Sequence, residues 1–168
     1  MDKTKLNQIL SLMILLFIIT ISNSYALKND QTKIAHIQAN YIKQLPQQNQ
    51  TTLLGHVTID QGSTHIRANK IYVYRSTQGE TKKIILYGKP ASYKTLTEKN
   101  KTPMTAIAQK IIYYPEQHKI ILIGKAHIDQ NGNTIIGPHL VYNTETQTLL
   151  SNTQGEHTIL ILQPQAKA

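Results

Sequence analysis

The stretch AIAQKIIYYPEQHKIILIGKAHI, residues 106–128, decides the fold of this chain. Two runs rich in β-branched residues flank a short polar break at Pro115-Glu116-Gln117-His118. This arrangement is typical of a β-hairpin. Ala108 opens the first run, and Gly124 interrupts the second. A hairpin with one small residue in each arm is therefore the unit from which we interpret the rest of the chain.

The same unit occurs four times, over residues 36–59, 65–93, 106–128 and 134–160. Each first arm has a small residue three positions before an apolar one, and each second arm has a glycine. The extra length of the second unit falls in the polar stretch 94–102, which we expect to form a loop outside the sheet. The small residues of the first arms are Ala39, Ala68, Ala108 and Gly137, and those of the second arms are Gly55, Gly88, Gly124 and Gly155.

Small residues inside strands mark a bend, a bulge or a close approach of another backbone. Small residues in register through stacked hairpins therefore predict an all-β, antiparallel sheet that folds over on itself and is open at both ends. The alternative is that they are ordinary small core residues. No segment after the N-terminal region keeps a helical period, and turn signals recur as in all-β folds.

Side chains alternate between the two faces of a strand, so each unit has an inward and an outward set. In the second unit Ile71 and Val73 share one face, and Tyr72 and Tyr74 share the other. Beyond the glycine of that unit the phase slips, and Tyr93 points inward. We expect the inward residues to line an apolar trough that no side chain of the protein fills. They are Leu53, Val57, Ile59, Ile71, Val73, Leu86, Tyr93, Ile111, Tyr113, Leu122, Ile128, Leu140 and Tyr142.

The N-terminal region, residues 1–26, has the pattern of a cleavable secretory signal. Lys3 and Lys5 precede an apolar stretch at 9–21, and Ser24-Tyr25-Ala26 is a small-x-small cleavage site. A membrane-spanning helix needs about 20 apolar residues, so this stretch is short for an anchor, although an uncleaved anchor is the alternative. We expect a flexible segment at 27–31, the β domain at 32–162 and a disordered tail at 163–168.

Composition and motifs exclude several classes of chemistry. The formal net charge of +9 suits an anionic partner, and the absence of cysteine excludes disulfides and thiolate metal sites. No phosphate-binding loop, hydrolase nucleophile motif or HExxH motif is present. We therefore expect neither an enzyme nor a cofactor, and the secretory signal together with the absence of a basic and aromatic motif disfavours nucleic acid.

Two pairs of equivalent residues are the remaining candidates for chemistry. His36 and His65 could form a metal pair, but two surface histidines are the simpler interpretation, because no carboxylate is spaced to complete a site. Asp60 and Asp129 could act as a carboxylate pair in glycoside cleavage. Both precede glycine-containing turns, where aspartate is favoured for turn geometry. We therefore predict no metal site and no catalytic residue.

Basic residues cluster around the expected loop. They could contact lipid phosphates or anionic sugars, and the simpler interpretation is a solvated surface. The cluster consists of Lys82, Lys83, Lys89, Lys94, Lys99 and Lys101.

Several short segments follow one another in an order that resembles the LptA/OstA family of periplasmic lipopolysaccharide-transport proteins. The similarity covers residue 32 to about residue 164. The segments that carry it are GHVTIDQG at 55–62, IRANKI at 66–71, YGKPA at 87–91, LIGKA at 122–126 and GPHLVY at 137–142.

This resemblance implies a twisted β-jellyroll whose interior holds the acyl chains of lipid A. It implies lipid contacts at Ile37, Tyr93 and Tyr113, and the family's aromatic at the position of Tyr93 is phenylalanine. It also implies the periplasm as location and head-to-tail association with copies of itself. The further partners that it implies are an inner-membrane-anchored protein of similar fold (LptC-like) and the N-terminal domain of an outer-membrane β-barrel protein (LptD-like).

We therefore expect a lipopolysaccharide-binding carrier that bridges the inner and outer membranes and shields the acyl chains in an apolar groove. Burying an acyl chain gains about 0.8 kcal/mol per methylene, which a folded-over apolar sheet can supply. The terminal strands, expected at 32–39 and 158–162, have unpaired edges that invite strand addition. The alternatives are a β-repeat module that binds polysaccharide or scaffolds the envelope, and an enzyme that acts on polysaccharide.

Overall fold

The computed structural model describes residues 33–97, 102–151, 155 and 157–164, and most of them lie in β-strands. The predicted signal at 1–26, the segment 27–31 and residues 165–168 of the predicted tail lie outside the described residues. Within the described part, no helix is long and apolar enough to cross a membrane. The strands are β1 Ala35–Gln38, β2 Tyr41–Leu45, β3 Gln50–Gln61, β4 Thr64–Arg75, β5 Thr81–Leu96, β6 Pro103–Tyr114, β7 Lys119–Gln130, β8 Asn133–Asn143, β9 Leu149–Ser151 and β10 Ile159–Ile161.

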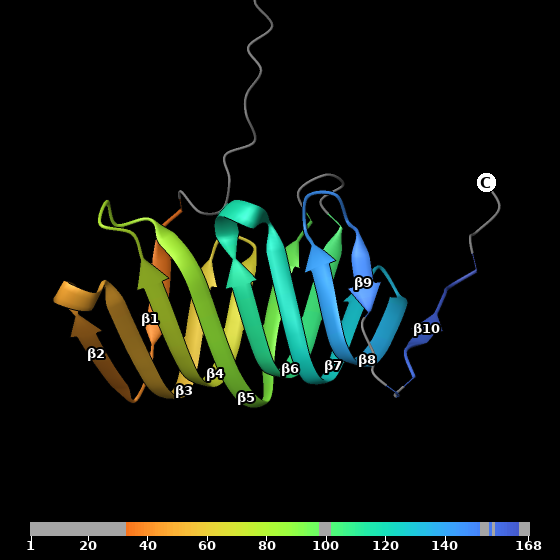
Figure 1. Cartoon of the computed structure of the whole chain (residues 1–168), viewed down its shortest axis with the longest axis horizontal. Helices are drawn as coiled ribbons and strands as arrows, with labels where there is room; N and C mark the ends of the chain where they lie inside the picture. Colours follow the sequence, from red (N-terminus) through yellow and green to blue (C-terminus); the bar gives the residue numbers. More distant parts are fainter. Residues whose placement is uncertain (1–32, 98–101, 152–154, 156, 165–168) are drawn as a thin grey trace, which may run out of the picture.

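The strands form one antiparallel sheet in the order β1-β3-β4-β5-β6-β7-β8-β10, with β2 paired to β3 and β9 paired to β8. From β3 to β8, strands that follow one another in the chain are neighbours in the sheet, as stacked hairpins require (Figure 1). The polar break at 115–118 is a 3-10 turn, η4 Pro115–Gln117, and its equivalent is η3 Pro46–Gln48. The predicted all-β, antiparallel class is confirmed.

Every long strand bends near its middle, and the bends line up across the sheet. The register between neighbouring strands shifts at 54/57 on β3, at 67/70 on β4, at 87/91 on β5, at 107/110 on β6 and at 123/126 on β7. Each shift contains one of the small residues picked out by the sequence. In Figure 1 the bends run along the lower edge, with β2 in front and β1 behind.

The bends divide the sheet into two layers that face each other. Layer 1 contains β1, β10 and the segments 57–61, 64–68, 91–96, 103–108, 126–130 and 133–137. Layer 2 contains β2, β9 and the segments 50–54, 70–75, 81–87, 110–114, 119–123 and 139–143. The ladders pair segments of the same layer.

Local backbone geometry explains why small residues stand at the bends. Gly55 and Gly124 have φ values of 73° and 77°, in the left-handed region that glycine tolerates best. At Gly88 the constraint is space, because a Cβ atom there would lie 2.6 Å from the Cα atom of Ala91. The bend of β5, between Tyr87 and Ala91, holds one residue more than the equivalent bends of β3 and β7, which accounts for the phase slip predicted before Tyr93.

Both ends of the sheet differ from the prediction in the same way. Instead of one strand at 32–39, the first arm is split at its bend into β1 and β2, which pair with the two halves of β3. The last arm is split into β9 and β10, which pair with the two halves of β8. Gly155 therefore lies between two strands, not within one. Each end of the sheet consists of a short strand in each layer.

The predicted loop at 94–102 was placed too early in the chain. β5 continues through Leu96, which pairs with Pro103, so residues 94–96 belong to layer 1. The Thr97 side chain is fully buried, and its hydroxyl accepts a hydrogen bond from the backbone N–H of Thr102 at 3.1 Å. The polar composition of this segment favoured a loop in the prediction, but its first residues form a strand with one face inside the protein. Residues 98–101 lie outside the described part of the chain.

Candidate functional site

The space between the two layers is the candidate site, and its walls are apolar. One continuous cluster of buried residues runs between the layers from β3 to β8. Leu86, Ile111, Leu122 and Leu140 are completely buried there. Except for Ile37 and Tyr113, all predicted inward residues are buried: Leu53, Val57, Ile59, Ile71, Val73, Leu86, Tyr93, Ile111, Leu122, Ile128, Leu140 and Tyr142.

Tyr113 and Ile37 occupy the interior only in part. Tyr113 is half-buried and packs against the cluster from layer 2. Ile37 pairs with Ile59 and shares its face, but it lies on the first strand and is 40% exposed. Among the described strands, none covers Ile37 on its other side, so the apolar interior of the described sheet is open at this end.

The expectation of an unfilled trough is wrong for the middle of the sheet. Side chains of the two layers pack against each other there, and Tyr93 of layer 1 meets Tyr113 of layer 2 with ring centroids 5.3 Å apart. The physical reason is that an apolar trough in water is costly, so the layers close on each other. Two cavities among the described residues lie instead near the two ends of the sheet.

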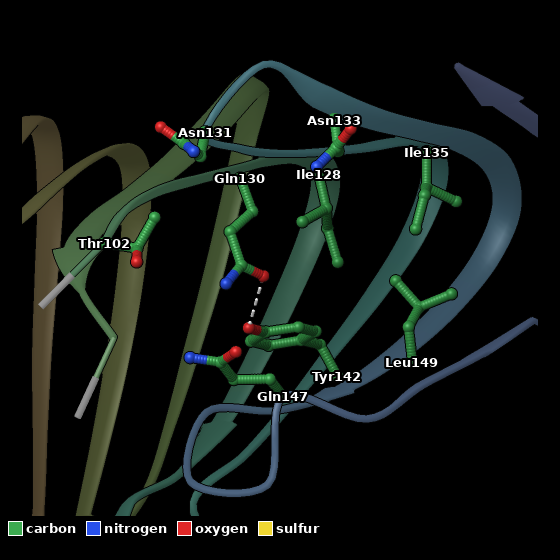
Figure 2. A pocket seen from close by; sticks show the side chains of 9 residues that line it. All are labelled: Thr102, Ile128, Gln130, Asn131, Asn133, Ile135, Tyr142, Gln147 and Leu149. Atoms are coloured by element: carbon green, nitrogen blue, oxygen red, sulfur yellow. Dashed lines mark hydrogen bonds between the residues drawn. The ribbon is translucent and has the colours of Figure 1, made fainter. Parts of the chain in front are cut away.

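The larger cavity lies at the β8 end and has a volume of about 320 Å³ (Figure 2). Tyr142 points into it from layer 2 and donates a hydrogen bond to the Gln130 side-chain oxygen of layer 1, at 2.8 Å. Apolar and amide side chains thus share the cavity wall. The lining residues are Thr102, Ile128, Gln130, Asn131, Asn133, Ile135, Tyr142, Gln147 and Leu149.

A second cavity, of about 230 Å³, lies at the β2 end of layer 2. It is lined by Leu45, Pro46 and the turns on either side of Arg75. The Arg75 guanidinium lies 3.4 Å from the Thr51 hydroxyl, within hydrogen-bonding distance. This rim is therefore polar and carries one fixed positive charge.

The edge where the layers meet, opposite the bends, is closed by side chains. We call it the seam. The Gln147 amide donates a hydrogen bond to the Thr97 hydroxyl at 3.2 Å, next to the Tyr142–Gln130 bond. The ladders run within layers, so separating the layers at the seam would break side-chain contacts while the sheet stays intact.

Two tyrosines of the interior have perturbed ionisation. Burial raises the pKa of Tyr93 well above its ordinary value of 10.0, and the nearby Tyr113 adds to this effect. Burial likewise raises the pKa of Tyr142. Both phenols are therefore neutral at physiological pH and act as hydrogen-bonding groups in an apolar wall.

Sequence reasoning missed several interior residues. Ile66 pairs with Ile59 and Tyr93, and Ile120 pairs with Tyr113 and Tyr142. Alternation extended outward from the predicted positions would have found both. Met104 and Ala106 are also buried, because β6 begins earlier than the repeat alone suggested.

The residues considered for metal binding lie on the outer surface of layer 1. The register places Asp60 between His36 and His65, a proximity that the sequence interpretation missed. The Asp60 carboxylate accepts hydrogen bonds from His65 at 2.7 Å and from Arg67 at 3.0 Å, which lower the pKa of Asp60. Within the described part of the chain, no group of three or more metal-ligating side chains is poised to hold a metal ion.

The carboxylate pair is not assembled. Asp60 lies on β3 and Asp129 on β7, four strand spacings apart, or about 19 Å. Paired glycosidase carboxylates stand about 5–9.5 Å apart. Asp129 instead accepts a hydrogen bond from the Thr134 hydroxyl at 3.0 Å, beside the turn.

The predicted lysine cluster is dispersed. Lys82 bonds to Glu80 and Glu116, which raise its pKa, with Glu116 the larger cause. Lys83 lies over the ring of Tyr74, and Lys94 is exposed on layer 1. Lys99 and Lys101 lie outside the described residues.

The bent two-layer sheet, its apolar interior and its short end strands define the class of this protein as a folded-over antiparallel β-jellyroll. Comparison with known families is specific: residues 36–148 match the model of the LptA/(LptD N-terminal domain) LPS transport proteins. The chain belongs to this family, and lipopolysaccharide transport is its role.

Curated relatives agree with the family assignment. The chain is 29% identical over 126 residues to the lipopolysaccharide export system protein LptH of Pseudomonas aeruginosa, covering 75% of this chain and 72% of LptH. It is 27% identical over 143 residues to LptA of Escherichia coli K12, covering 84% of this chain and 77% of LptA.

A solved structure supports the fold. The crystal structure of LptH, described as the LptA-homologous periplasmic component of the lipopolysaccharide transport device of Pseudomonas aeruginosa, superposes with a TM-score of 0.72. The match covers 80% of this chain and 99% of LptH, at 24% identity. The folded-over β-jellyroll is thus shared between the two proteins.

Proposed function

We propose that this protein is a periplasmic carrier that binds lipopolysaccharide through its lipid A acyl chains, between the two layers of the sheet. The observation that carries the proposal is the apolar interior, whose two walls are joined by backbone only at the bends. Acyl chains that enter would replace the contacts between the layers. Each buried methylene contributes about 0.8 kcal/mol, so the exchange can be favourable.

Entry would start at the seam near the β8 end. Here the layers are held by the Tyr142–Gln130 and Gln147–Thr97 hydrogen bonds, next to a cavity of about 320 Å³. A neutral hydrogen bond contributes only about 1 kcal/mol net, so these contacts are weak compared with a backbone ladder. The sugar and phosphate groups of the ligand would remain outside the seam, in water.

The two ends of the sheet suit head-to-tail association. At the β1 end the inward-facing Ile37 and Ile42 are 40% and 50% exposed, and at the β10 end Leu160 is 57% exposed. Their equivalents in the middle of the sheet are buried. A strand edge of another molecule could pair with these short strands and extend both layers and the interior.

Such continuity would allow a chain of molecules to bridge the envelope. We propose, as partners at the two ends, an inner-membrane-anchored protein of similar fold (LptC-like) and the N-terminal domain of an outer-membrane β-barrel protein (LptD-like). Export by the predicted signal at 1–26 would place the protein in the periplasm. Its role is transport without catalysis.

One structural observation favours the alternative of a polysaccharide-binding module. The middle of the interior is packed, and a module that binds only glycans needs no open trough. Family membership favours transport, and the two functions differ in what they bind. A carrier requires the acyl chains, whereas a glycan module binds the sugars with or without them.

The test is capture of lipopolysaccharide by residues 27–168, which contain every strand of the sheet. We expect purified protein to retain intact lipopolysaccharide after size-exclusion chromatography. We expect it not to retain a chemically deacylated form of lipopolysaccharide. Equal retention of both forms would favour the glycan module, and retention of neither would contradict the proposal.

A further inference from the structure

The outward surface of layer 2 has a composition that the transport function does not explain. Tyrosines and lysines alternate there across four neighbouring strands, β4 to β7. Their neighbours along each strand point inward and are buried, such as Ile71, Leu86 and Ile111. We define the lysine–tyrosine face by the residues Lys70, Tyr72, Tyr74, Lys83, Tyr87, Lys110, Tyr114 and Lys119.

The charged and aromatic groups of this face are in contact. The ammonium groups of Lys70, Lys83, Lys110 and Lys119 lie 4.8, 4.6, 5.4 and 4.9 Å from the ring centroids of Tyr72, Tyr74, Tyr87 and Tyr114. Two of the rings also touch edge to face, with centroids 6.2 Å apart. Cation–π contacts favour the placement of each ammonium group over a ring, so positive charge and aromatic surface lie side by side on this face.

Within the described residues, no carboxylate forms an ion pair with a lysine of this face. The layer 2 segments of the strands contain neither aspartate nor glutamate. Glu80 and Glu116 belong to turns next to the face, and both bond to Lys82. Layer 1, in contrast, carries Asp60 and Asp129. The lysine–tyrosine face is therefore complementary to an anionic surface.

The side chains between the tyrosines indicate what kind of anionic surface the lysine–tyrosine face would contact. Ile85, Ile112 and Ile121 point outward from the same strands and are half-buried. Tyrosine rings, aliphatic groups and lysines with apolar stems are the side chains suited to a membrane–water interface. A sugar polymer would need open ring faces for stacking, and here lysine ammonium groups lie over them.

We propose that the lysine–tyrosine face docks on the surface of a phospholipid membrane rich in anionic headgroups. The tyrosines would lie at headgroup level, and the lysines would contact the phosphates. The face covers four strands, about 14 Å across, and belongs to a sheet layer suited to lying along a membrane. This docking would hold the carrier beside a membrane independently of the ligand between its layers.

Vesicle binding tests the proposal, using residues 27–168 so that the predicted signal does not contribute. Each lysine near an anionic leaflet is worth about fivefold in affinity. The triple variant Lys70→Gln, Lys83→Gln, Lys110→Gln is therefore expected to bind phosphatidylglycerol-rich vesicles about 100-fold more weakly, at low salt. Pure phosphatidylcholine vesicles should bind neither protein.

The matched control removes the same charge elsewhere. Lys89, Lys94 and Lys125 are exposed and lie outside the face, and their triple change to glutamine should reduce binding by less than about fivefold. Equal losses in both triple variants would show an effect of net charge alone and overturn the proposal. Capture of dextran sulfate without binding to vesicles would overturn it as well.

A second measurement reports contact directly. The chain has no tryptophan, so a single introduced indole is an unambiguous probe. Emission of the Tyr72→Trp variant should shift to the blue on anionic vesicles, whereas Ile107→Trp, on the outer surface of layer 1, should not shift. A shift at Ile107→Trp alone would place the membrane contact on the other layer and contradict the assignment.

Discussion

Leu122 offers the most direct measure of how much the closed interior stabilises the protein. It is completely buried on β7, and its register partners Ile111 and Leu140 are completely buried too. Leu122→Ala removes three carbon groups, worth about 2.4 kcal/mol at about 0.8 kcal/mol each. A partly relaxed cavity adds about 1 kcal/mol, so we expect a loss of about 3.5 kcal/mol.

Urea unfolding of residues 27–168, followed by circular dichroism, measures this loss. With a denaturant dependence of about 2 kcal/mol per M, the midpoint should fall by about 1.7 M. The matched control is Ile121→Ala, the adjacent residue, whose half-exposed side chain points out of layer 2. It should shift the midpoint by about 0.5 M or less. Equal shifts for the two variants would refute the inward and outward assignment.

Three further predictions follow from individual contacts. Gly88→Ala should lower the free energy of unfolding, measured in urea, by more than about 2 kcal/mol, because its Cβ atom would lie 2.6 Å from backbone carbons of the bend. Gly79→Ala, where a Cβ atom would have open space, should lower it by about 1 kcal/mol. Similar losses for the two variants would argue against the tight bend. Tyr93→Phe should lose less stability than the parent between pH 10 and 12, because the folded state holds the phenol proton that the unfolded state releases above about pH 10, and parallel curves would contradict its burial. Leu149→Glu, which puts a charge into the larger cavity, should weaken lipopolysaccharide capture at least tenfold, and Leu150→Glu, whose side chain is 64% exposed, should not; equal effects would exclude this cavity as the entry point.

The bends and the faces could be predicted because both are local properties. The sequence alone shows a glycine or alanine at a fixed place in every hairpin, and it also shows the alternation of side chains within a strand. The phase slip before Tyr93 could also be predicted, since the inward residues change from even-numbered positions before Gly88 to odd-numbered positions after it. These signals predicted the folded-over sheet before any tertiary contact was known.

The closure of the layers could not be predicted in the same way. The Tyr142–Gln130 and Gln147–Thr97 bonds join residues that only the folded sheet brings together. The sequence predicts apolar inner walls, but it does not indicate that these walls pack against each other. In the folded chain the two apolar walls pack against each other, so the proposed binding of acyl chains requires the layers to separate.

The central claim is that lipid A acyl chains lie between the two layers. A photo-reactive leucine analogue can be placed at Leu53, which is 1% exposed and faces the interior, or at the adjacent Leu54, which faces outward. After irradiation with bound lipopolysaccharide, we predict a covalent adduct from position 53 and none from position 54. Adducts from position 54 alone, or equally from both, would contradict the account.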